Sequence, residues 1–357
     1  MPVKREMMVR RDALAQIAIN ETLAPEPGEG EVLLEIEAFA LTANNVTYAV
    51  VGETMRYWDF FPAPEGWGIV PVWGHARVTA SRHAEIAVGE RVYGYLPIAT
   101  HLIVAPGKIS AGLFRDLAAH RQPMATVYNQ YRRLAHDPAH DPAREDARML
   151  FEPLFLTSFL IEDQLRRAAW HGAETLIVTS ASSKTALGLA HVARAASRAV
   201  RRVGLTSAGN VAFVERTGLY DQVLAYDALD ELAVAPAVLV DFAGDAAVLA
   251  GVAARLGAAL AHVLKVGVTH HDAEPAAMVA GPKPLWFFAP DAAAAMIADG
   301  GADAFQAAVA LRWSGFVAEA EGWVTIEQAR GSDQNQRVWR DLVAGKAKPD
   351  AGHVLRW

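Results

Sequence analysis

The chain has 357 residues, of which 52% are hydrophobic and 20% charged, and its formal net charge at pH 7 is −7. This length suggests two domains or one large one, and the acidic balance argues against a nucleic-acid-binding surface. The sequence contains no cysteine, which excludes disulfides and thiolate metal ligands and makes a cytoplasmic protein the default expectation. No apolar run reaches membrane-spanning length, and the basic N-terminus lacks the apolar core of a signal peptide.

The first third of the chain is predicted to be rich in strands. Val32–Leu41 alternates and then becomes solidly apolar, which predicts a strand that enters a core. A polar stretch, TANNVTYAVVGE (residues 42–53), and an aromatic-rich loop, MRYWDFFPAPEGWG (residues 55–68), follow it. Short strands separated by turn residues continue beyond them. We therefore expect a small, mostly β, barrel-like domain over residues 1–135.

A polar, proline-bearing stretch at residues 136–146 precedes a region in which strands and helices alternate. Apolar runs predict strands at residues 175–178, 199–205, 222–226, 237–244 and 261–270, and helical spacing predicts helices from residue 184 and over residues 246–256. This alternation predicts a doubly wound parallel sheet whose ligand crevice lies at the carboxyl ends of its strands. We expect a Rossmann-like α/β domain over residues 150–290. Residues 291–357, with a helix at 336–344 and a closing strand, are expected to return to the first domain.

The turn after residues 175–178 is the first candidate binding element. A strand, a tight turn and a helix in this order direct backbone N–H groups at an anion. Serines and alanine replace the glycines of a dinucleotide fingerprint, but small residues still let a pyrophosphate approach the backbone. The candidate ligands are Ser180, Ser182, Ser183, Lys184 and Thr185. The alternatives are an ordinary tight turn without a ligand and a Walker phosphate loop, which lacks both of its required glycines here.

A second turn, at residues 206–210, follows the next predicted strand. An NAD-preferring site places Asp or Glu at this point, where the carboxylate accepts a hydrogen bond from the ribose 2′-hydroxyl. The turn reads TSAGN and carries no charge, so it accommodates a 2′-phosphate. We therefore predict NADPH (NADP+) as the cofactor, with Thr206, Ser207 and Asn210 among its ligands.

Three segments carry a resemblance to a known family. The first segment is GEVLLEIEAFALTANNVTYAVVGE, the second is GERVYGYLPIATHLIVAP and the third is ETLIVTSASSKTALGLAHVARA. In this order, they resemble the opening strand, the barrel strands and the coenzyme-binding unit of the medium-chain dehydrogenase/reductase superfamily. The resemblance implies a GroES-like barrel domain and a Rossmann-like domain. The variants NNVTY, RYWDFFPAPEGWG, YNQYRR and SASSKTA resemble a bacterial branch on the zinc-free, quinone-oxidoreductase side of the superfamily.

The zinc-dependent branch needs a cysteine and a histidine as ligands. Gly74-His75 is similar to its histidine motif, but Ala76 and Arg77 follow where a glutamate would be expected. We interpret His75 as a residue of the barrel and predict no metal.

The resemblance also implies an active site. Candidate catalytic residues are Asn45, Thr47, Tyr48, Tyr57 and Tyr128, and candidate substrate-pocket residues are Trp58, Asn129 and Tyr131. Further cofactor ligands are Thr157, Gly244, Gly267 and Thr269. The alternatives are that the tyrosines only pack, with satisfied hydroxyls, and that the Thr157 hydroxyl bonds its own helix backbone.

The favoured function is a zinc-independent, NADPH-dependent oxidoreductase. It would deliver hydride to an activated C=C or C=O bond of a quinone, enone, enal or ketone, and Tyr48 or Asn45 would stabilise the enolate oxygen. The alternatives are a non-catalytic NADP(H)-binding sensor and a nucleotide-assisted lyase-type activity. The expected partner is a small molecule, with no nucleic acid and no membrane. The resemblance implies a homodimer, in which a strand edge would be covered.

Overall fold

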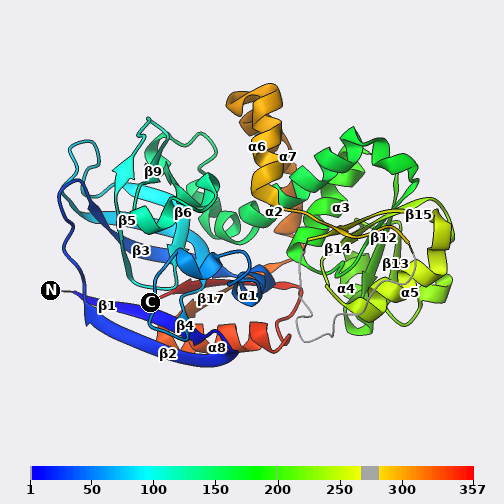
Figure 1. The fold of residues 1–357 in the computed structure, drawn as a ribbon, viewed down its shortest axis with the longest axis horizontal. Helices are drawn as coiled ribbons and strands as arrows, with labels where there is room; N and C mark the ends of the chain where they lie inside the picture. Colours follow the sequence, from blue (N-terminus) through cyan, green and yellow to red (C-terminus); the bar gives the residue numbers. More distant parts are fainter. Residues whose placement is uncertain (1, 198, 267–280) are drawn as a thin grey trace. The chain divides into compact units, whose positions relative to one another are not determined.

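The computed structural model describes residues 2–197, 199–266 and 281–357. The chain divides into two compact units, which we call unit 1 (Met1–Leu150 and Ile326–Trp357) and unit 2 (Phe151–Thr325). Figure 1 shows both, coloured along the sequence. Among the described helices, none is long and apolar enough to cross a membrane.

Unit 1 is built from two mainly antiparallel sheets. The larger has nine strands, in the order β17-β18-β3-β5-β6-β10-β9-β8, with β7 also paired to β3. Its strands are β3 (Val32–Leu41), β5 (Pro71–Ser81), β6 (Arg91–Pro97), β7 (His101–Val104), β8 (Pro106–Gly107), β9 (Leu113–Asp116), β10 (Gln130–Arg133), β17 (Thr325–Arg330) and β18 (Ala351–Arg356). The smaller pairs β2 (Ala13–Leu23), β1 (Val3–Arg10) and β4 (Trp67–Gly68). The predicted β-rich, barrel-like domain is confirmed.

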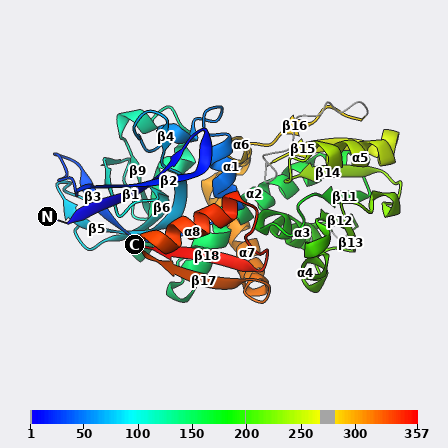
Figure 2. The same ribbon diagram turned by 90° about the horizontal axis from the view of Figure 1, so that it is seen from below.

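The C-terminal segment completes the core of unit 1. Strand β18 pairs antiparallel with β3, and helix α8 (Gly331–Val343) lies beside β18 (Figure 2). The Trp339 side chain on α8 is fully buried, and its indole N–H donates to the Leu14 carbonyl over 2.8 Å. A segment distant in sequence therefore supplies both a strand and a core side chain.

Unit 2 contains a six-stranded sheet in the order β13-β12-β11-β14-β15-β16. Every neighbouring pair in it is parallel. The strands are β11 (Thr175–Val178), β12 (Arg201–Thr206), β13 (Gln222–Ala225), β14 (Ala237–Asp241), β15 (Leu260–Lys265) and β16 (Leu285–Trp286). The strand order reverses between β11 and β14, which confirms the predicted doubly wound sheet and marks the edge where such folds bind ligands.

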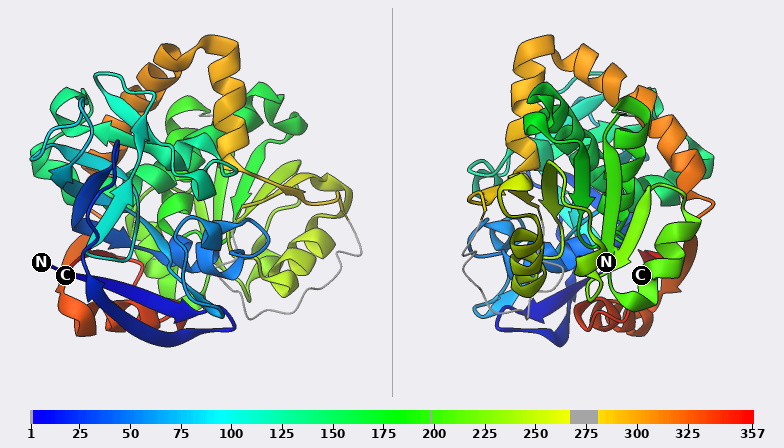
Figure 3. Two further views of the ribbon diagram at one scale, coloured as in Figure 1. Left: turned by 60° about the vertical axis from the view of Figure 1, so that its left-hand side comes forward. Right: turned by 90° about the vertical axis from the view of Figure 1, so that its right-hand side faces the viewer.

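Three helices lie between strands of this sheet in the sequence: α3 (Lys184–Ala196), α4 (Val211–Arg216) and α5 (Ala246–Leu256). Helix α2 (Glu145–Arg167) precedes β11, α6 (Ala289–Gly300) and α7 (Ala302–Ala320) follow β16, and α1 (Ala43–Val50) belongs to unit 1. Helices α6 and α7 meet at a sharp bend at Gly301, where φ is +84° (Figure 3). Phe316 of α7 stacks on Phe155 of α2, with ring centroids 4.9 Å apart. This packing keeps α6 and α7 in unit 2, so unit 1 resumes at Ile326, whereas the predicted return segment begins at residue 291.

Candidate functional site

The turn between β11 and α3 has the backbone of a glycine-rich turn without its glycines. Ser180 has a φ of +49°, a left-handed conformation that favours glycine. Its N–H donates to the Tyr226 hydroxyl over 2.9 Å, and its carbonyl accepts from the Ser183 N–H over 2.8 Å. These two bonds hold Ser180 in a conformation that a serine rarely adopts.

Glycines do appear where the turn and helix α3 approach their neighbours. A Cβ at Gly204 of β12 would lie 2.9 Å from the Ala181 Cβ, and one at Gly188 of α3 would lie 2.7 Å from the Ser158 hydroxyl. Ser158 in turn donates to the Thr185 carbonyl over 2.7 Å. The sequence analysis missed Ser158, Gly188 and Gly204, because the close approaches they allow lie outside the turn itself.

Ser182 joins the two predicted turns. Its hydroxyl oxygen is buried and accepts from the Thr206 hydroxyl over 3.3 Å and from Asn210 Nδ2 over 3.2 Å. The structure thus brings the turns at residues 179–186 and 206–210 together at the carboxyl edge of the sheet. Ser207 is exposed in the second turn.

Helix α3 begins at this edge. The Ser183 hydroxyl caps it by accepting from the Ala186 N–H over 3.3 Å. Lys184 and Thr185 occupy the first turn and are half-buried. A capped helix start, with a cation in its first turn, is a suitable place for an anion.

A buried network lies beside the turn, where the strand order reverses. The Thr179 hydroxyl donates to Asp241 Oδ1 over 2.6 Å and accepts from the N–H groups of Phe242 (3.0 Å) and Ala243 (3.1 Å). Asp241 Oδ1 also accepts from the Gly244 N–H over 3.1 Å. Asp241 is fully buried, and this burial raises the pKa of its carboxyl. The network fixes the loop that carries Gly244 against the first turn, and sequence reasoning did not single out Thr179 or Asp241.

The remaining predicted cofactor ligands are placed as follows. The Thr157 hydroxyl donates to the Pro153 carbonyl in its own helix over 3.3 Å. This is the backbone hydrogen bond that the sequence analysis gave as the alternative to cofactor binding. Gly267 and Thr269 lie outside the described residues.

In unit 1, the Asn45 side chain anchors helix α1. Its Oδ1 accepts from the Thr42 N–H over 2.8 Å in a capping box, and its Nδ2 donates to the Pro71 carbonyl over 2.9 Å. Both ends of the Asn45 amide therefore hold helix α1 in place, and its catalytic role stays a prediction. In the fold, Asn45 positions Thr47, which is half-buried, and Tyr48, which is buried.

Tyr48 belongs to a compact group that we call the tyrosine cluster: Tyr48, Tyr57, Tyr95 and Tyr128. Ring centroids lie 4.5 Å apart for Tyr48 and Tyr57 and 4.7 Å apart for Tyr95 and Tyr128. The hydroxyl oxygens of Tyr57 and Tyr128 are 3.2 Å apart. Burial raises the pKa of every member of the cluster. Its hydroxyls therefore remain protonated and able to donate hydrogen bonds at neutral pH.

The structure gives the three predicted pocket residues packing roles instead. Trp58 is 2% exposed in the core, where a Cβ at Gly52 would lie 2.2 Å from its Nε1, so it is enclosed and unable to stack on a substrate. Asn129 is buried and exchanges two hydrogen bonds with Arg121, of 3.0 and 2.8 Å. The Tyr131 hydroxyl accepts from Arg121 and donates to the Tyr95 carbonyl, both over 2.8 Å. These hydrogen bonds hold Asn129 and Tyr131 in place beside Tyr95 and Tyr128 of the tyrosine cluster.

His75 lies within the barrel, as interpreted. It is 1% exposed, and burial lowers its pKa to about 3. Its ring centroid is 5.2 Å from that of Tyr93 and 6.5 Å from that of His140. Within the described parts of the chain, no group of three or more His, Cys, Asp or Glu side chains is arranged to hold a metal ion.

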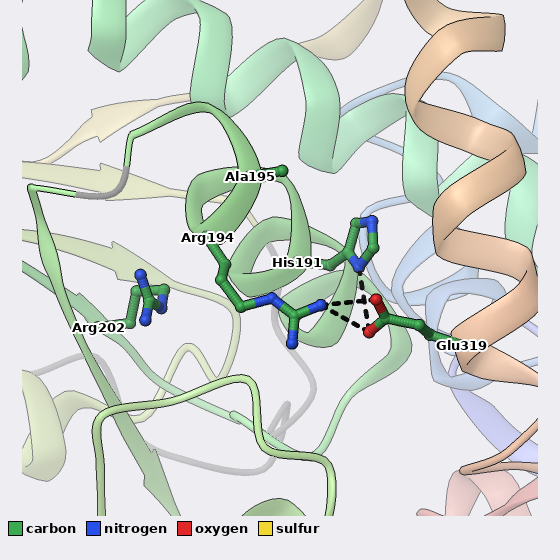
Figure 4. Close-up of a pocket in the computed structure, with 5 residues that line it drawn as sticks. All are labelled: His191, Arg194, Ala195, Arg202 and Glu319. Carbon is green, nitrogen blue, oxygen red and sulfur yellow. Dashed lines mark hydrogen bonds and ion pairs between the residues drawn. The ribbon is translucent and has the colours of Figure 1, made fainter.

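A separate recess in unit 2 is lined by His191, Arg194, Ala195, Arg202 and Glu319 (Figure 4). Arg194 donates to both Glu319 oxygens over 2.7 Å, and His191 Nδ1 lies 3.5 Å from Glu319 Oε2. Arg202 donates to the Leu219 carbonyl over 2.9 Å and to Asp221 over 2.8 Å. Because these cations are engaged by protein groups, we interpret the recess as a brace between α3 and α7.

Comparison with known proteins places the chain. A family model described as "Protein of unknown function (DUF2855)" matches residues 39–348, and no curated protein matched the sequence. The fold is similar to that of CurA from Vibrio vulnificus in complex with NADPH, at 15% identity and a TM-score of 0.62 over 99% of this chain and 98% of that one. It is also similar to mycobacterial Rv1454c complexed with NADPH, at 14% identity and a TM-score of 0.60 over 99% and 100%.

A third structure, the yhdH oxidoreductase from Salmonella enterica in complex with NADP, matches at 12% identity and a TM-score of 0.57 over 99% of each chain. These likenesses confirm the predicted fold, in which a Rossmann-like α/β domain accompanies a β-rich, barrel-like domain.

Proposed function

We propose that this chain, which belongs to the DUF2855 family, is a zinc-independent, NADPH-dependent oxidoreductase. One observation carries the proposal: Ser182 joins two strand-end turns beside the strand-order reversal of a doubly wound sheet. This is the edge at which such sheets bind dinucleotides. The similar structures of CurA and Rv1454c were determined with NADPH, which supports the same cofactor here.

The residues at this edge fit the cofactor. Small side chains line the turn, and the capped start of α3 offers N–H groups and the positive end of its dipole to the phosphates. Lys184 adds a cation, and the uncharged second turn, with Ser207 exposed and Asn210 half-buried, suits a 2′-phosphate. When bound, the cofactor supplies the hydride.

The tyrosine cluster suits the substrate side of the reaction. Tyr48, Tyr57 and Tyr128 are neutral, buried donors, and a neutral phenol both stabilises a developing enolate or alkoxide oxygen and releases a proton. We propose the Tyr57–Tyr128 pair as the donor to a quinone, enone, enal or ketone. Turnover on a panel of these compounds, compared with NADPH binding alone, separates an oxidoreductase from a sensor. Binding with no turnover would favour the sensor.

The cofactor preference has its own test. NADPH should bind more tightly than NADH in a fluorescence titration, and Ser207→Asp should weaken NADPH selectively by placing a carboxylate near the 2′-phosphate. Ser207→Asn is the matched uncharged control and should retain the preference. Equal affinities of the parent protein for the two nucleotides would contradict the proposal.

Two further properties rest on the resemblance. We propose that activity survives exhaustive chelation, and a stoichiometric zinc by elemental analysis would count against this. We also propose a homodimer, which sedimentation at working concentration can test.

A further inference from the structure

Strands β5 and β6 present a row of polar aromatic side chains. Trp73 and His75 are two residues apart on β5 and so share a face, and they pair with Tyr95 and Tyr93 of β6. Ring centroids are 5.1 Å apart for Trp73 and Tyr95, 5.8 Å for Trp73 and Tyr93, and 5.2 Å for His75 and Tyr93. We call these residues the polar row: Trp73, His75, Tyr93 and Tyr95.

Several polar atoms of this row are buried without a partner. Trp73 Nε1, both ring nitrogens of His75 and the Tyr95 hydroxyl make no hydrogen bond of ordinary geometry within the described residues, although Trp73 and Tyr95 lie near enough to the Tyr48 hydroxyl to act against the rise in its pKa. Buried polar groups are nearly always satisfied, and ordered water is the usual partner when protein is not. Internal water molecules along this strand pair would satisfy such atoms.

The polar row joins two different environments. At its inner end, Tyr95 packs on Tyr128 of the tyrosine cluster, with centroids 4.7 Å apart. At its outer end, His75 faces His140, whose Nε2 lies 2.7 Å from Glu145 Oε1. The Glu145 side chain is 20% exposed, so this end reaches solvent.

We propose that the polar row is a water-filled proton path that reprotonates the tyrosine cluster through His75 from the partly exposed Glu145 and His140. The inference rests on the proposed function. For each hydride transferred to the substrate, one cluster hydroxyl gives up a proton and becomes a phenolate. The phenolate takes a proton from an adjacent water. Each group along the row then takes a proton from its outer neighbour, until a proton from solvent restores the outermost group. Overall, one proton enters from solvent for each hydride transferred.

His75 suits this role because a neutral imidazole accepts a proton at one nitrogen and releases one from the other. The groups around it are Tyr93, His140 and Glu145, together with Arg91 and Arg148. Burial and the arginines lower the pKa of His75, whereas Glu145 acts in the opposite direction. A relay that stays neutral does not retain the proton it passes on. The simpler alternative is that His75 only fills the barrel.

Paired variants test the relay. His75→Phe keeps an aromatic ring but removes both proton-carrying nitrogens, and His136→Phe replaces an exposed histidine of the same unit as a control. We expect His75→Phe to lower kcat at least tenfold and to raise the solvent isotope effect on kcat, with NADPH affinity and single-turnover hydride transfer unchanged. His75→Ala with added imidazole should regain activity, which guards against a mere folding defect.

The outcomes are distinguishable. An active wild-type protein whose kcat and solvent isotope effect are unchanged by His75→Phe would overturn the proton path alone. A wild-type protein that binds NADPH but turns over no substrate would overturn the proposed function and the path with it. Ordered waters bonded to Trp73 Nε1, His75 and the Tyr95 hydroxyl in a high-resolution crystal structure would support the path, and a closed, dry row would contradict it.

Discussion

The strand ends of unit 2 and the polar row of unit 1 differ in how fully their buried polar groups are hydrogen-bonded. At the strand ends, the Thr179 hydroxyl, the Ser182 hydroxyl and Asp241 Oδ1 each take part in two or more hydrogen bonds, and of these side chains only Asp241 keeps one atom, Oδ2, without a partner among the described residues. In unit 1, Trp73, His75 and Tyr95 keep buried polar atoms with no partner among the described residues.

We propose that the difference separates a scaffold in unit 2 from a reaction site in unit 1. A largely satisfied network holds its backbone still, so it can present N–H groups to a ligand in fixed positions. An unsatisfied buried group is costly and is retained where it has water, a substrate or a proton to exchange. We therefore expect substitutions in unit 2 to act mainly on stability and affinity, and those in unit 1 mainly on rate.

The largest expected effect tests the reactive side of this comparison. Tyr128→Phe removes one hydroxyl of the proposed donor pair, and general acid catalysis contributes roughly 10²- to 10⁴-fold. We expect kcat for the reduced substrate to fall by about that factor, with NADPH affinity and the unfolding midpoint nearly unchanged. A large loss of stability with normal kcat would reverse the roles assigned to the two regions.

Thr179→Val tests the scaffold. The substitution removes a hydroxyl that serves one carboxyl and two N–H groups in a fully buried site, so the free energy of unfolding should fall by about 3 kcal/mol. Thr175→Val, at the start of β11, the strand that Thr179 directly follows, is the control. The Thr175 hydroxyl makes no hydrogen bond within the described residues, so the expected change is below about 1 kcal/mol. Denaturant melts measure the free energy of unfolding of both variants. Equal losses for Thr179→Val and Thr175→Val would show that the Thr179 network does not stabilise the fold.

Lys184→Ala tests whether the turn between β11 and α3 contributes to cofactor affinity and not to stability. A charge-assisted hydrogen bond to a phosphate contributes about 1.5–3 kcal/mol, so NADPH affinity should drop roughly tenfold to a hundredfold, and less at high salt. Stability should hardly change, because a cation gains nothing from the dipole at a helix start. Arg201→Ala, an exposed cation at the opposite end of β12, should leave affinity intact. If both variants bind NADPH normally, Lys184 does not contact the phosphates.

The last prediction concerns acid. Because the pKa of His75 is lowered to about 3 by burial, the unfolded chain binds a proton that the folded chain excludes between about pH 6.5 and pH 3. Stability therefore falls as pH falls through this window, by up to about 1.4 kcal/mol per pH unit. Between pH 6.5 and pH 5, His75→Phe should lose less stability than the wild type, and His136→Phe should match the wild type. Parallel curves for all three would show that His75 is protonated in the folded state.

The fold could be predicted because its pattern is periodic and local. The apolar run at residues 175–178 and the helical spacing over residues 246–256 reappear as β11 and α5. The reversal of strand order also follows from alternating strands and helices. The assignment of α6 and α7 to unit 2 did not follow, because it depends on the packing of Phe316 against Phe155.

The candidate site was harder to predict. Asn45 was predicted to be functional because it lies in the segment that the resemblance places near the active site, and Trp58 because its ring could stack on a flat substrate. Only the structure shows the glycine packed against Trp58 and the cap that holds the Asn45 amide. Ser180 was chosen for its size, whereas its left-handed backbone depends on the distant Tyr226 hydroxyl. His75 was correctly read as a barrel residue, but its unsatisfied nitrogens could not be inferred from the residues around it in sequence.

The completion of unit 1 by residues 326–357 has a consequence for how the protein is made. During synthesis, β3 cannot pair with β18 until residues 351–356 have been made. All of unit 2 has been synthesised before then. Domains generally fold as units during synthesis, so unit 2 is expected to fold first, even though unit 1 begins before it in the sequence. Until then the open edge of β3 is a site for mispairing, which gives chaperones a defined strand to protect.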